Sequence, residues 1–325
     1  MHISDKTQIL CDLEEKTYDP KRNRTLQTNK TKQTVTVIIP FKDKWFLTKK
    51  CLEGLVKQKQ EHTSLSILLV DNNSCEAETK KGLEKFKEIH KQIPIRVLLC
   101  QTAFNFSYIN NFAVKSLEKK SDFLWFLNND TSFISQETLE NYTTFASQQK
   151  KLGALGSTLL FGDEKTIQHS FLAPGVKIVG AHPLKGQLYK KDALWFKKPR
   201  IIPAVTGASL FISYENFCSV GMFDEKLAFS SQDLDLCLRL AEKGLQNWTL
   251  TNEIIIHHES MTRSHSFKED EIYYFYKKWG KKLETFSKLS TWNEEPCLKF
   301  LPLKYPWALA MRIQNYLSSS SLKTT

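Results

Sequence analysis

The sequence contains no uninterrupted apolar run of the roughly 18–20 residues that a helix needs to cross a bilayer. Its beginning, MHISDKTQILCDLEEKTYDP, carries acidic residues early and no apolar segment, so we expect no secretory signal there. The seven cysteines are scattered along the chain and form no CxxC pair. Such a dispersed, odd set indicates reduced thiols. These absences predict a soluble, cytoplasmic protein.

Basic residues are in excess, and they are unevenly spread. Lys and Arg number 46 against 35 Asp and Glu, which gives a net charge of +11. Hydrophobic residues make up 41% of the chain, enough for a sizeable core. The basic residues gather at 20–33 and 185–200. Such patches suit nucleic acid, anionic lipid or phosphorylated substrates, and they equally suit an ordinary solvated surface.

Strand and helix patterns alternate from residue 34 onwards. Apolar runs predict buried strands over 34–40, 65–71, 94–100 and 122–128, and helical spacing predicts helices over about 47–56, 76–92 and 110–118. Continuous apolar strands alternating with helices predict an α/β fold, with a mostly parallel sheet covered by helices on both faces.

The second half of the chain is less regular. We expect a helix over about 136–150, a strand over 152–161, long loops over 162–203, a strand over 204–213, a helix over 230–245 and a final strand over 253–258. We divide the chain into a mobile polar extension (1–33), a main domain (34–266) and a helical, aromatic and basic extension (267–325).

Two segments of the last extension are helix candidates. The first is EIYYFYKKWGKKL (271–283), and the second begins at Pro306. Lysines interleaved with aromatic residues fit a membrane interface. They fit equally well a helical pair that packs on the main domain.

Four predicted strand ends carry polar or turn-forming residues, namely Pro40, Asp71, the segment 101–105 and the triplet Asn128-Asn129-Asp130. In open α/β sheets, ligands bind beyond the carboxyl ends of the strands. Asp and Asn are also common turn formers, so no single residue is diagnostic. Their convergence at one edge of the sheet predicts a ligand site.

Asp130 is the first candidate for metal chemistry. A carboxylate at a strand end can bind Mg²⁺ or Mn²⁺ together with substrate phosphates, although the same triplet would also make an ordinary turn. His257 and His258 are the last two residues of the final predicted strand and point to opposite faces, so at most one can reach the same ion as Asp130. An imidazole ligand would favour Mn²⁺ slightly.

Asp233 and Asp235 open the predicted helix 230–245. Ser230 and Asp233 fit an S-x-x-D capping box, and Asp235 can pair with Arg239 one turn later. A carboxylate at the start of a helix can also act as a general base. The spacing leaves both interpretations open.

Seven blocks in order resemble the inverting family 2 glycosyltransferases of the GT-A fold: VTVIIPFKDKWFLTKKCLEGL, ILLVDNNS, FNFSYINNFAV, FLWFLNND, VTGASLFI…VGMFDEKL, SQDLDLCLRLAEKGL and IIIHHES. The resemblance covers residues 34 to about 262 and is nearest to rhamnosyltransferases and to O-antigen or cell-wall polysaccharide synthases. It implies a UDP-, dTDP- or GDP-linked sugar donor and a glycan or polyprenyl-linked acceptor in bacterial cell-envelope synthesis.

The resemblance also implies roles for individual residues on the donor side. Pro40 and Asp71 match positions that contact the nucleobase, and Asn105 and Asn111 match a segment that lines the nucleotide. The triplet Asn128, Asn129 and Asp130 matches the family's D-x-D-like element. Asp130 would hold the divalent cation, Mn²⁺ or Mg²⁺, at the donor diphosphate. His257 matches a metal-ligating histidine, with His258 as the alternative.

On the acceptor side, the resemblance makes Asp233 the catalytic base. Gly207, Ala208 and Asp235 match positions beside the acceptor. Four positions depart from the family pattern. Asn128-Asn129 replaces an acidic start, Gln232 stands where many relatives carry an acid, and Phe41 stands where a small or hydroxylated residue is common.

Other functions are disfavoured. A sugar nucleotidyltransferase usually has a glycine-rich loop after the first strand, whereas PFKDKW has no glycine. A basic protein that binds nucleic acid would show a helix-turn-helix, zinc-finger or RNA-binding signature; none is visible, so we expect no nucleic acid partner. A glycan-binding protein without catalysis would not need Asp130, Asp233 and His257. The basic patches raise the further hypothesis of peripheral contact with the anionic cytoplasmic face of the inner membrane.

Overall fold

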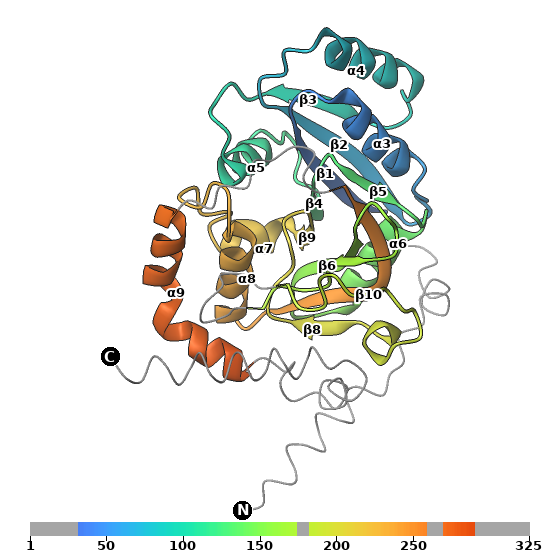
Figure 1. The fold of residues 1–325 in the computed structure, drawn as a ribbon. Coiled ribbons are helices and arrows are strands. Elements are labelled where there is room, and N and C mark those ends of the chain that lie inside the picture. The colour runs from blue at the N-terminus through green and yellow to red at the C-terminus, as the bar shows by residue number, and fades with distance from the viewer. Residues whose placement is uncertain (1–31, 174–181, 259–268, 290–325) are drawn as a thin grey trace, which may run out of the picture. The chain divides into compact units, whose positions relative to one another are not determined.

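The computed structural model describes residues 32–173, 182–258 and 269–289 (Figure 1). The strands are β1 (Gln33–Phe41), β2 (Thr63–Asp71), β3 (Ile95–Leu99), β4 (Phe123–Leu127), β5 (Thr131–Phe133), β6 (Leu152–Leu160), β7 (Ile167–His169), β8 (Arg200–Ile202), β9 (Ser209–Ser213) and β10 (Gln246–His257). The helices are α3 (Trp45–Val56), α4 (Ala77–Ile89), α5 (Phe106–Lys115), α6 (Thr138–Gln148), the 3-10 turn η1 (Leu194–Lys197), α7 (Tyr214–Ser219), α8 (Gln232–Glu242) and α9 (Glu269–Leu289).

The strands form one ten-stranded sheet in the order β3-β2-β1-β4-β9-β6-β10-β5, with β7 beside β6 and β8 beside β10. The first four strands in this order are parallel to one another, and β6 and β10 run in the same direction. The antiparallel strand β9 separates the two parallel groups, and the short strands β5, β7 and β8 are also antiparallel to their neighbours. The predicted α/β fold with a mostly parallel sheet is confirmed.

Helices cover both faces of the sheet, and strand β4 illustrates why. Its residue Phe126 is buried in one cluster with Ile109 of α5 and Leu234 of α8. The preceding Trp125 points to the other face, where its ring lies 5.1 Å from that of Tyr142 in α6. Because alternate residues of a strand point to opposite faces, a continuous apolar run supplies both layers.

Two elements begin earlier than the sequence predicts. Helix α5 starts at Phe106, because the side chain of Asn105 accepts a hydrogen bond from Tyr108 N at 2.9 Å and caps the helix. Strand β10 starts at Gln246 rather than 253, since the amide of Asn247 bonds to Ala154 N and Pro203 O inside the sheet. The predicted loop region 162–203 contains the short elements β7, η1 and β8.

The first predicted helix of the tail is present as α9. Phe275 and Trp279 are 0% and 2% exposed and join the main hydrophobic cluster, whereas Tyr273 is 71% exposed. The packed alternative therefore holds for this helix. The candidate helix from Pro306 and residues 1–31 of the predicted N-terminal extension lie outside the described residues. Among the helices that are described, none is long and apolar enough to span a bilayer.

Candidate functional site

The carboxyl ends of β1 to β4 meet at one edge of the sheet, as the sequence predicts. Phe41 is aligned with Asp71, and Asp71 with Leu99. The β1–β4 register pairs Ile38 with Phe126, which places the end of β4 beside the end of β1. Asp71 is buried, and its Oδ1 accepts a hydrogen bond from Ser74 N at 2.7 Å. Its predicted contact with a nucleobase, like that of the half-buried Pro40, stays a prediction.

Asp130 and His257 lie together at this edge. The antiparallel pairing of β10 with β5 aligns His257 with Thr131, and His258 N donates to the backbone oxygen of Asp130 at 2.9 Å. As a result, His257 Nε2 is 3.1 Å from Asp130 Oδ1, and both side chains are buried. The structure thus brings together the two residues that the sequence proposes as metal ligands.

Gln168, on β7, fixes the orientation of the His257 ring. Its Oε1 is 2.6 Å from His257 Nδ1, and its Nε2 donates to the backbone oxygen of His257 at 3.2 Å. An amide oxygen can only accept, so Nδ1 of His257 carries a hydrogen. Nε2 therefore faces Asp130 Oδ1, and a cation bound by both atoms would join them.

The Asp130–His257 pair has the spacing of two neighbouring metal ligands. Two bonds of about 2.1 Å at a right angle place their ligand atoms about 3.0 Å apart, close to the 3.1 Å observed. The described residues contain no group of three or more His, Cys, Asp or Glu that could hold a metal ion. The pair therefore fits a cation such as Mn²⁺ or Mg²⁺ only if water or a phosphorylated ligand completes the coordination.

His258 does not share this position. Its Nε2 lies 3.2 Å from Ser132 Oγ and 3.1 Å from Lys50 Nζ. Burial, and then the charge of Lys50, lower the pKa of His258. The expectation that at most one of the two histidines reaches Asp130 agrees with this geometry, and the one that does is His257.

The two asparagines before Asp130 point in different directions. Asn128 Nδ2 is 3.2 Å from His257 Nε2, so its side chain lines the Asp130–His257 pair. Asn129 Nδ2 instead donates to Thr48 Oγ1 of α3 at 2.9 Å, and the residue is buried. The placement of Asn129 gives no support to its predicted donor contact, because its side chain ties the turn to α3.

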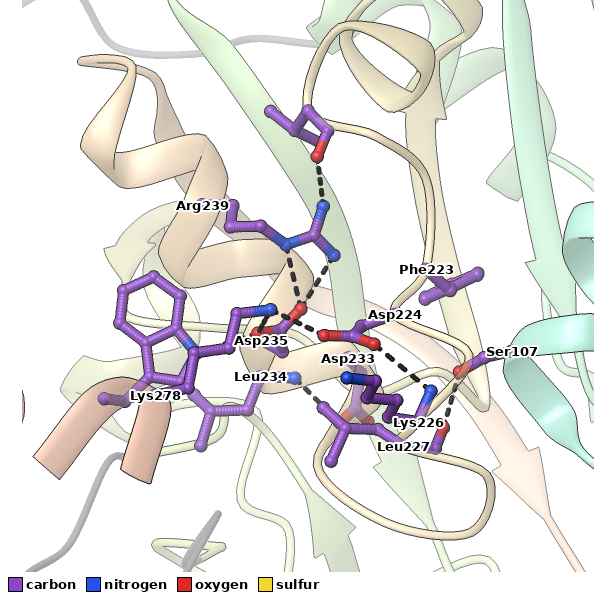
Figure 2. Close-up of polar contacts among 12 residues, drawn as sticks. Ser107, Phe223, Asp224, Lys226, Leu227, Asp233, Leu234, Asp235, Arg239 and Lys278 are labelled. Atoms are coloured by element: carbon purple, nitrogen blue, oxygen red, sulfur yellow. Dashed lines mark hydrogen bonds and ion pairs between the residues drawn. The ribbon is translucent and has the colours of Figure 1, made fainter. Parts of the chain in front are cut away.

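Asp233 is half-buried at the start of α8, where Figure 2 shows it beside Leu234. Oδ2 accepts from Gly207 N and Oδ1 accepts from Leu234 N, both at 2.8 Å. The predicted capping box is wrong. Ser231 is the N-cap, with a left-handed φ of 62° and no side-chain hydrogen bond. Ser230 and Asp233 therefore do not form the two ends of a capping box.

The segment Gly207-Ala208 connects Asp233 with the Asp130–His257 pair. Gly207 N binds the carboxylate of Asp233, and Ala208 O accepts from Asn128 N at 3.0 Å. A Cβ on Gly207 would lie 3.1 Å from the ring of Phe106, so a larger residue requires that ring to shift by a few tenths of an ångström. One two-residue segment therefore contacts both Asp233 and Asn128, the residue that lines the Asp130–His257 pair.

Asp235 is enclosed rather than open (Figure 2). Its side chain is 0% exposed, and it binds Arg239 at 2.8 Å, Lys278 Nζ at 2.7 Å and Trp279 Nε1 at 2.8 Å. The predicted pairing with Arg239 is confirmed. The predicted acceptor-side role has no open face here, because the partners from α8 and α9 surround the carboxylate.

Asn105 and Asn111 use their amides on a neighbouring segment. Asn111 accepts from Phe223 N at 3.1 Å and donates to Phe223 O at 2.9 Å. Asn105 Nδ2 donates to Glu225 O at 2.9 Å. Asn111 is buried with both amide atoms engaged, so its placement supports a structural role rather than the predicted contact with a nucleotide.

Sequence reasoning missed two residues that shape the site, Gln168 and Glu271. Gln168 lies in the region predicted as long loops. Glu271 of α9 accepts from Phe229 N and Ser230 N, just before α8. A glutamine in a loop and an acid in a charged helix carry no signal of such contacts.

Comparison with known proteins matches the model of "Glycosyl transferase family 2" to residues 36–213. The O-antigen biosynthesis protein RfbC of Myxococcus xanthus is 32% identical over 235 residues, which are 70% of this chain and 18% of that protein. The uncharacterized protein y4gI of Sinorhizobium fredii is 31% identical over 239 residues, 71% of this chain and 25% of that protein. The chain thus spans a quarter or less of each of these curated relatives.

Solved structures share the fold at low identity. GalNAc-T7 with UDP, GalNAc and Mn²⁺ has a TM-score of 0.61 at 12% identity, covering 79% of this chain and 50% of that one. The mannosyltransferase PcManGT of Pyrobaculum calidifontis, with GDP-Man and Mn²⁺, has a TM-score of 0.57 at 13% identity, covering 93% and 81%. TarS 1–349 of S. aureus with UDP-GlcNAc has 0.51 at 16% identity, covering 73% and 62%.

Proposed function

The chain belongs to glycosyl transferase family 2, and we propose that it transfers a sugar, with inversion, from a nucleotide-diphosphate donor to a hydroxyl of a glycan or lipid-linked glycan. The observation that supports this proposal is the series of contacts through which Gly207, Ala208 and Asn128 connect Asp233 with the Asp130–His257 pair. A base and a cation site at one sheet edge are what a single displacement at a sugar diphosphate requires.

Asp130 and His257 hold the donor end of this site. A divalent cation bound there would neutralise the charge that develops on the departing nucleoside diphosphate. Asp130 contributes a carboxylate oxygen and His257 contributes Nε2, which Gln168 orients through Nδ1. Asn128 Nδ2 lies 3.2 Å from the same Nε2, so this amide would turn aside when Nε2 binds the cation.

Asp233 acts as the general base for the acceptor hydroxyl. The acceptor hydroxyl oxygen forms a bond to the anomeric carbon while the bond from that carbon to the diphosphate oxygen breaks. The hydroxyl proton passes to the carboxylate of Asp233. Attack from the side opposite the leaving group inverts the configuration. The amides of Gly207 and Leu234 fix the carboxylate, so it meets the acceptor already oriented.

The acceptor in this proposal is a glycan or a polyprenyl-linked glycan of a bacterial surface polysaccharide. The likeness to a protein named for O-antigen biosynthesis supports that class. The excess of Lys and Arg fits peripheral contact with anionic lipid, where a lipid-linked acceptor carries its diphosphate. A lipid-linked acceptor presented in anionic vesicles is therefore the first substrate for a transfer assay.

The proposal is tested by calorimetric titration with UDP, dTDP and GDP, each with and without Mn²⁺. We expect one nucleotide to bind selectively and to require the metal. The corresponding nucleotide sugar should then release its nucleoside diphosphate in the presence of an acceptor. Failure of all three nucleotides to bind in the presence of Mn²⁺ would contradict the proposed donor site.

Replacing Gln168 with Leu should weaken Mn²⁺-dependent nucleotide binding by about 10–100-fold, the usual cost of losing a residue that orients a metal-binding histidine. Leucine keeps the approximate volume but cannot bond to either Nδ1 or the backbone oxygen of His257. The matched control is Ser132→Ala, which removes the similar contact to His258 and should leave the affinity unchanged. Equal affinity of Q168L and the unmodified protein would exclude this role.

A further inference from the structure

The segment that leads into α8 is held along its length by α5. We call residues 223–230 the base loop, because it ends just before Ser231 and the helix that carries Asp233. Its contacts to α5 are Asn111 to both backbone groups of Phe223, Asn105 Nδ2 to Glu225 O, Ser107 Oγ to Leu227 O and Phe106 N to Ala228 O.

Helix α9 holds the same loop at both ends. Tyr274 OH and Lys278 Nζ bind Asp224 Oδ2 at 2.8 and 2.7 Å (Figure 2 shows Lys278 reaching Asp224 and Asp235). Burial raises the pKa of Asp224, but the hydrogen bonds from Lys278 and Tyr274 outweigh it and hold the pKa below its usual value. Asp224 therefore stays a carboxylate and keeps its two partners.

At the other end of the loop, Glu271 is the partner. Its Oε2 accepts from Phe229 N at 3.0 Å, from Ser230 N at 3.1 Å and from Ser230 Oγ at 3.4 Å. Glu271 is buried at 6% exposure. A buried carboxylate on two successive amides fixes the backbone far more firmly than solvent would.

Ser231, the residue that follows the base loop, has a strained backbone. Ser231 has a φ of 62°, a left-handed conformation that residues other than glycine, asparagine and aspartate seldom adopt. Such a conformation persists only where the surroundings impose it. Glu271 fixes the two amides before Ser231, and Asp235 N, inside α8, donates to Ser231 O at 2.9 Å. The turn that aims Asp233 at Gly207 is thus set between two anchors.

We propose that Glu271 of α9 is a positioning residue for the catalytic base, holding Phe229 and Ser230 so that the turn at Ser231 places Asp233 against Gly207. This inference rests on the proposed function of Asp233. It makes α9, which lies beyond the matched residues 36–213, a working part of the transferase site.

The chemistry of Glu271 allows a discriminating pair of variants. All three contacts are made by the single oxygen Oε2. The carbonyl oxygen of glutamine can accept the same hydrogen bonds, so Glu271→Gln should retain the position of the loop. Glu271→Ala leaves two half-buried amides without this acceptor, so the loop should loosen.

The experiment measures three quantities for each variant: hydrogen exchange at the amides of Phe229 and Ser230, nucleotide affinity in the presence of Mn²⁺, and kcat with KM for the sugar donor. For E271A we expect faster exchange at both amides, a kcat lower by about 100-fold and a nearly unchanged nucleotide affinity, because misplacement of a catalytic group by about an ångström has such an effect. E271Q should recover most of the turnover.

Phe275→Leu is the matched control, because Phe275 is a fully buried residue of the same helix whose role is packing. It should lower the melting temperature while kcat and exchange at Phe229 and Ser230 stay near the values of the unmodified protein. Unchanged exchange in E271A, or faster exchange with normal kcat, would overturn the positioning role. So would a loss of kcat in F275L equal to that in E271A. Absence of turnover in the unmodified protein would instead count against the proposed function.

Discussion

Asp233→Asn abolishes sugar transfer while metal-dependent nucleotide binding persists: this is the largest effect that we expect from a single substitution. An asparagine at 233 cannot accept the proton of the acceptor hydroxyl, and general-base catalysis is worth about 10²–10⁴-fold in rate. Asparagine also has a single acceptor oxygen for the two amides, Gly207 N and Leu234 N, that the carboxylate binds. Both effects lower kcat. The measurement is the rate of nucleoside diphosphate release with a saturating acceptor.

Asp122→Asn provides the matched control for D233N. Asp122 also accepts a backbone amide, Thr34 N at 2.7 Å, but it precedes β4 and so lies at the opposite edge of the sheet from Asn128. The same chemical change there should leave kcat within a few-fold of normal. Turnover by D233N within tenfold of the unmodified protein would rule out Asp233 as the base.

Asp130→Ala should remove metal-dependent nucleotide binding, the second large effect. The substitution deletes one of the two side chains that can ligate the cation, and the other, His257, then faces no carboxylate. We expect an affinity loss of at least about 100-fold, since even the loss of a residue behind a ligand costs 10–100-fold. The measurement is the same calorimetric titration with Mn²⁺ present.

Asn129, the neighbour of Asp130, provides the control for D130A. Asn129 is buried next to Asp130, but its amide binds Thr48 of α3 instead of the metal pair. Asn129→Ala should cost about 1 kcal/mol of stability for the lost hydrogen bond and leave the nucleotide affinity intact. Equal losses in N129A and D130A would mean that the turn itself, rather than the carboxylate, is required.

The fold was largely predictable because long apolar runs dictate strands that are buried on both faces. The convergent carboxyl ends of the parallel strands followed from that pattern, whereas the order of the strands in the sheet was not predicted. The site was predictable only in part. Asp130, His257 and Asp233 belong to residue types that suit their chemistry, and the resemblance singled them out.

The sequence does not predict which of two neighbouring asparagine side chains faces the site. Asn128 lines it and Asn129 points to α3, a difference set by the backbone of a turn. Nor could it find Gln168, which reaches His257 from a distant strand, since such contacts follow no periodic pattern. The capping box at Ser230 failed because the left-handed turn at Ser231 redirects Asp233 to Gly207.

The Asp130–His257 pair cannot form before strand β10 pairs with β5. Asn128 and His257 are 129 positions apart in the chain, whereas the strands β1 to β4 are complete by Leu127. During synthesis, strands β1 to β4 can therefore fold early. The Asp130–His257 pair forms only after a late pairing between strands that are distant in the chain, and such pairings form slowly. Glu271 emerges later still. We expect a nascent chain to stay catalytically silent until its last described helix has left the ribosome, which separates the onset of folding from the onset of activity.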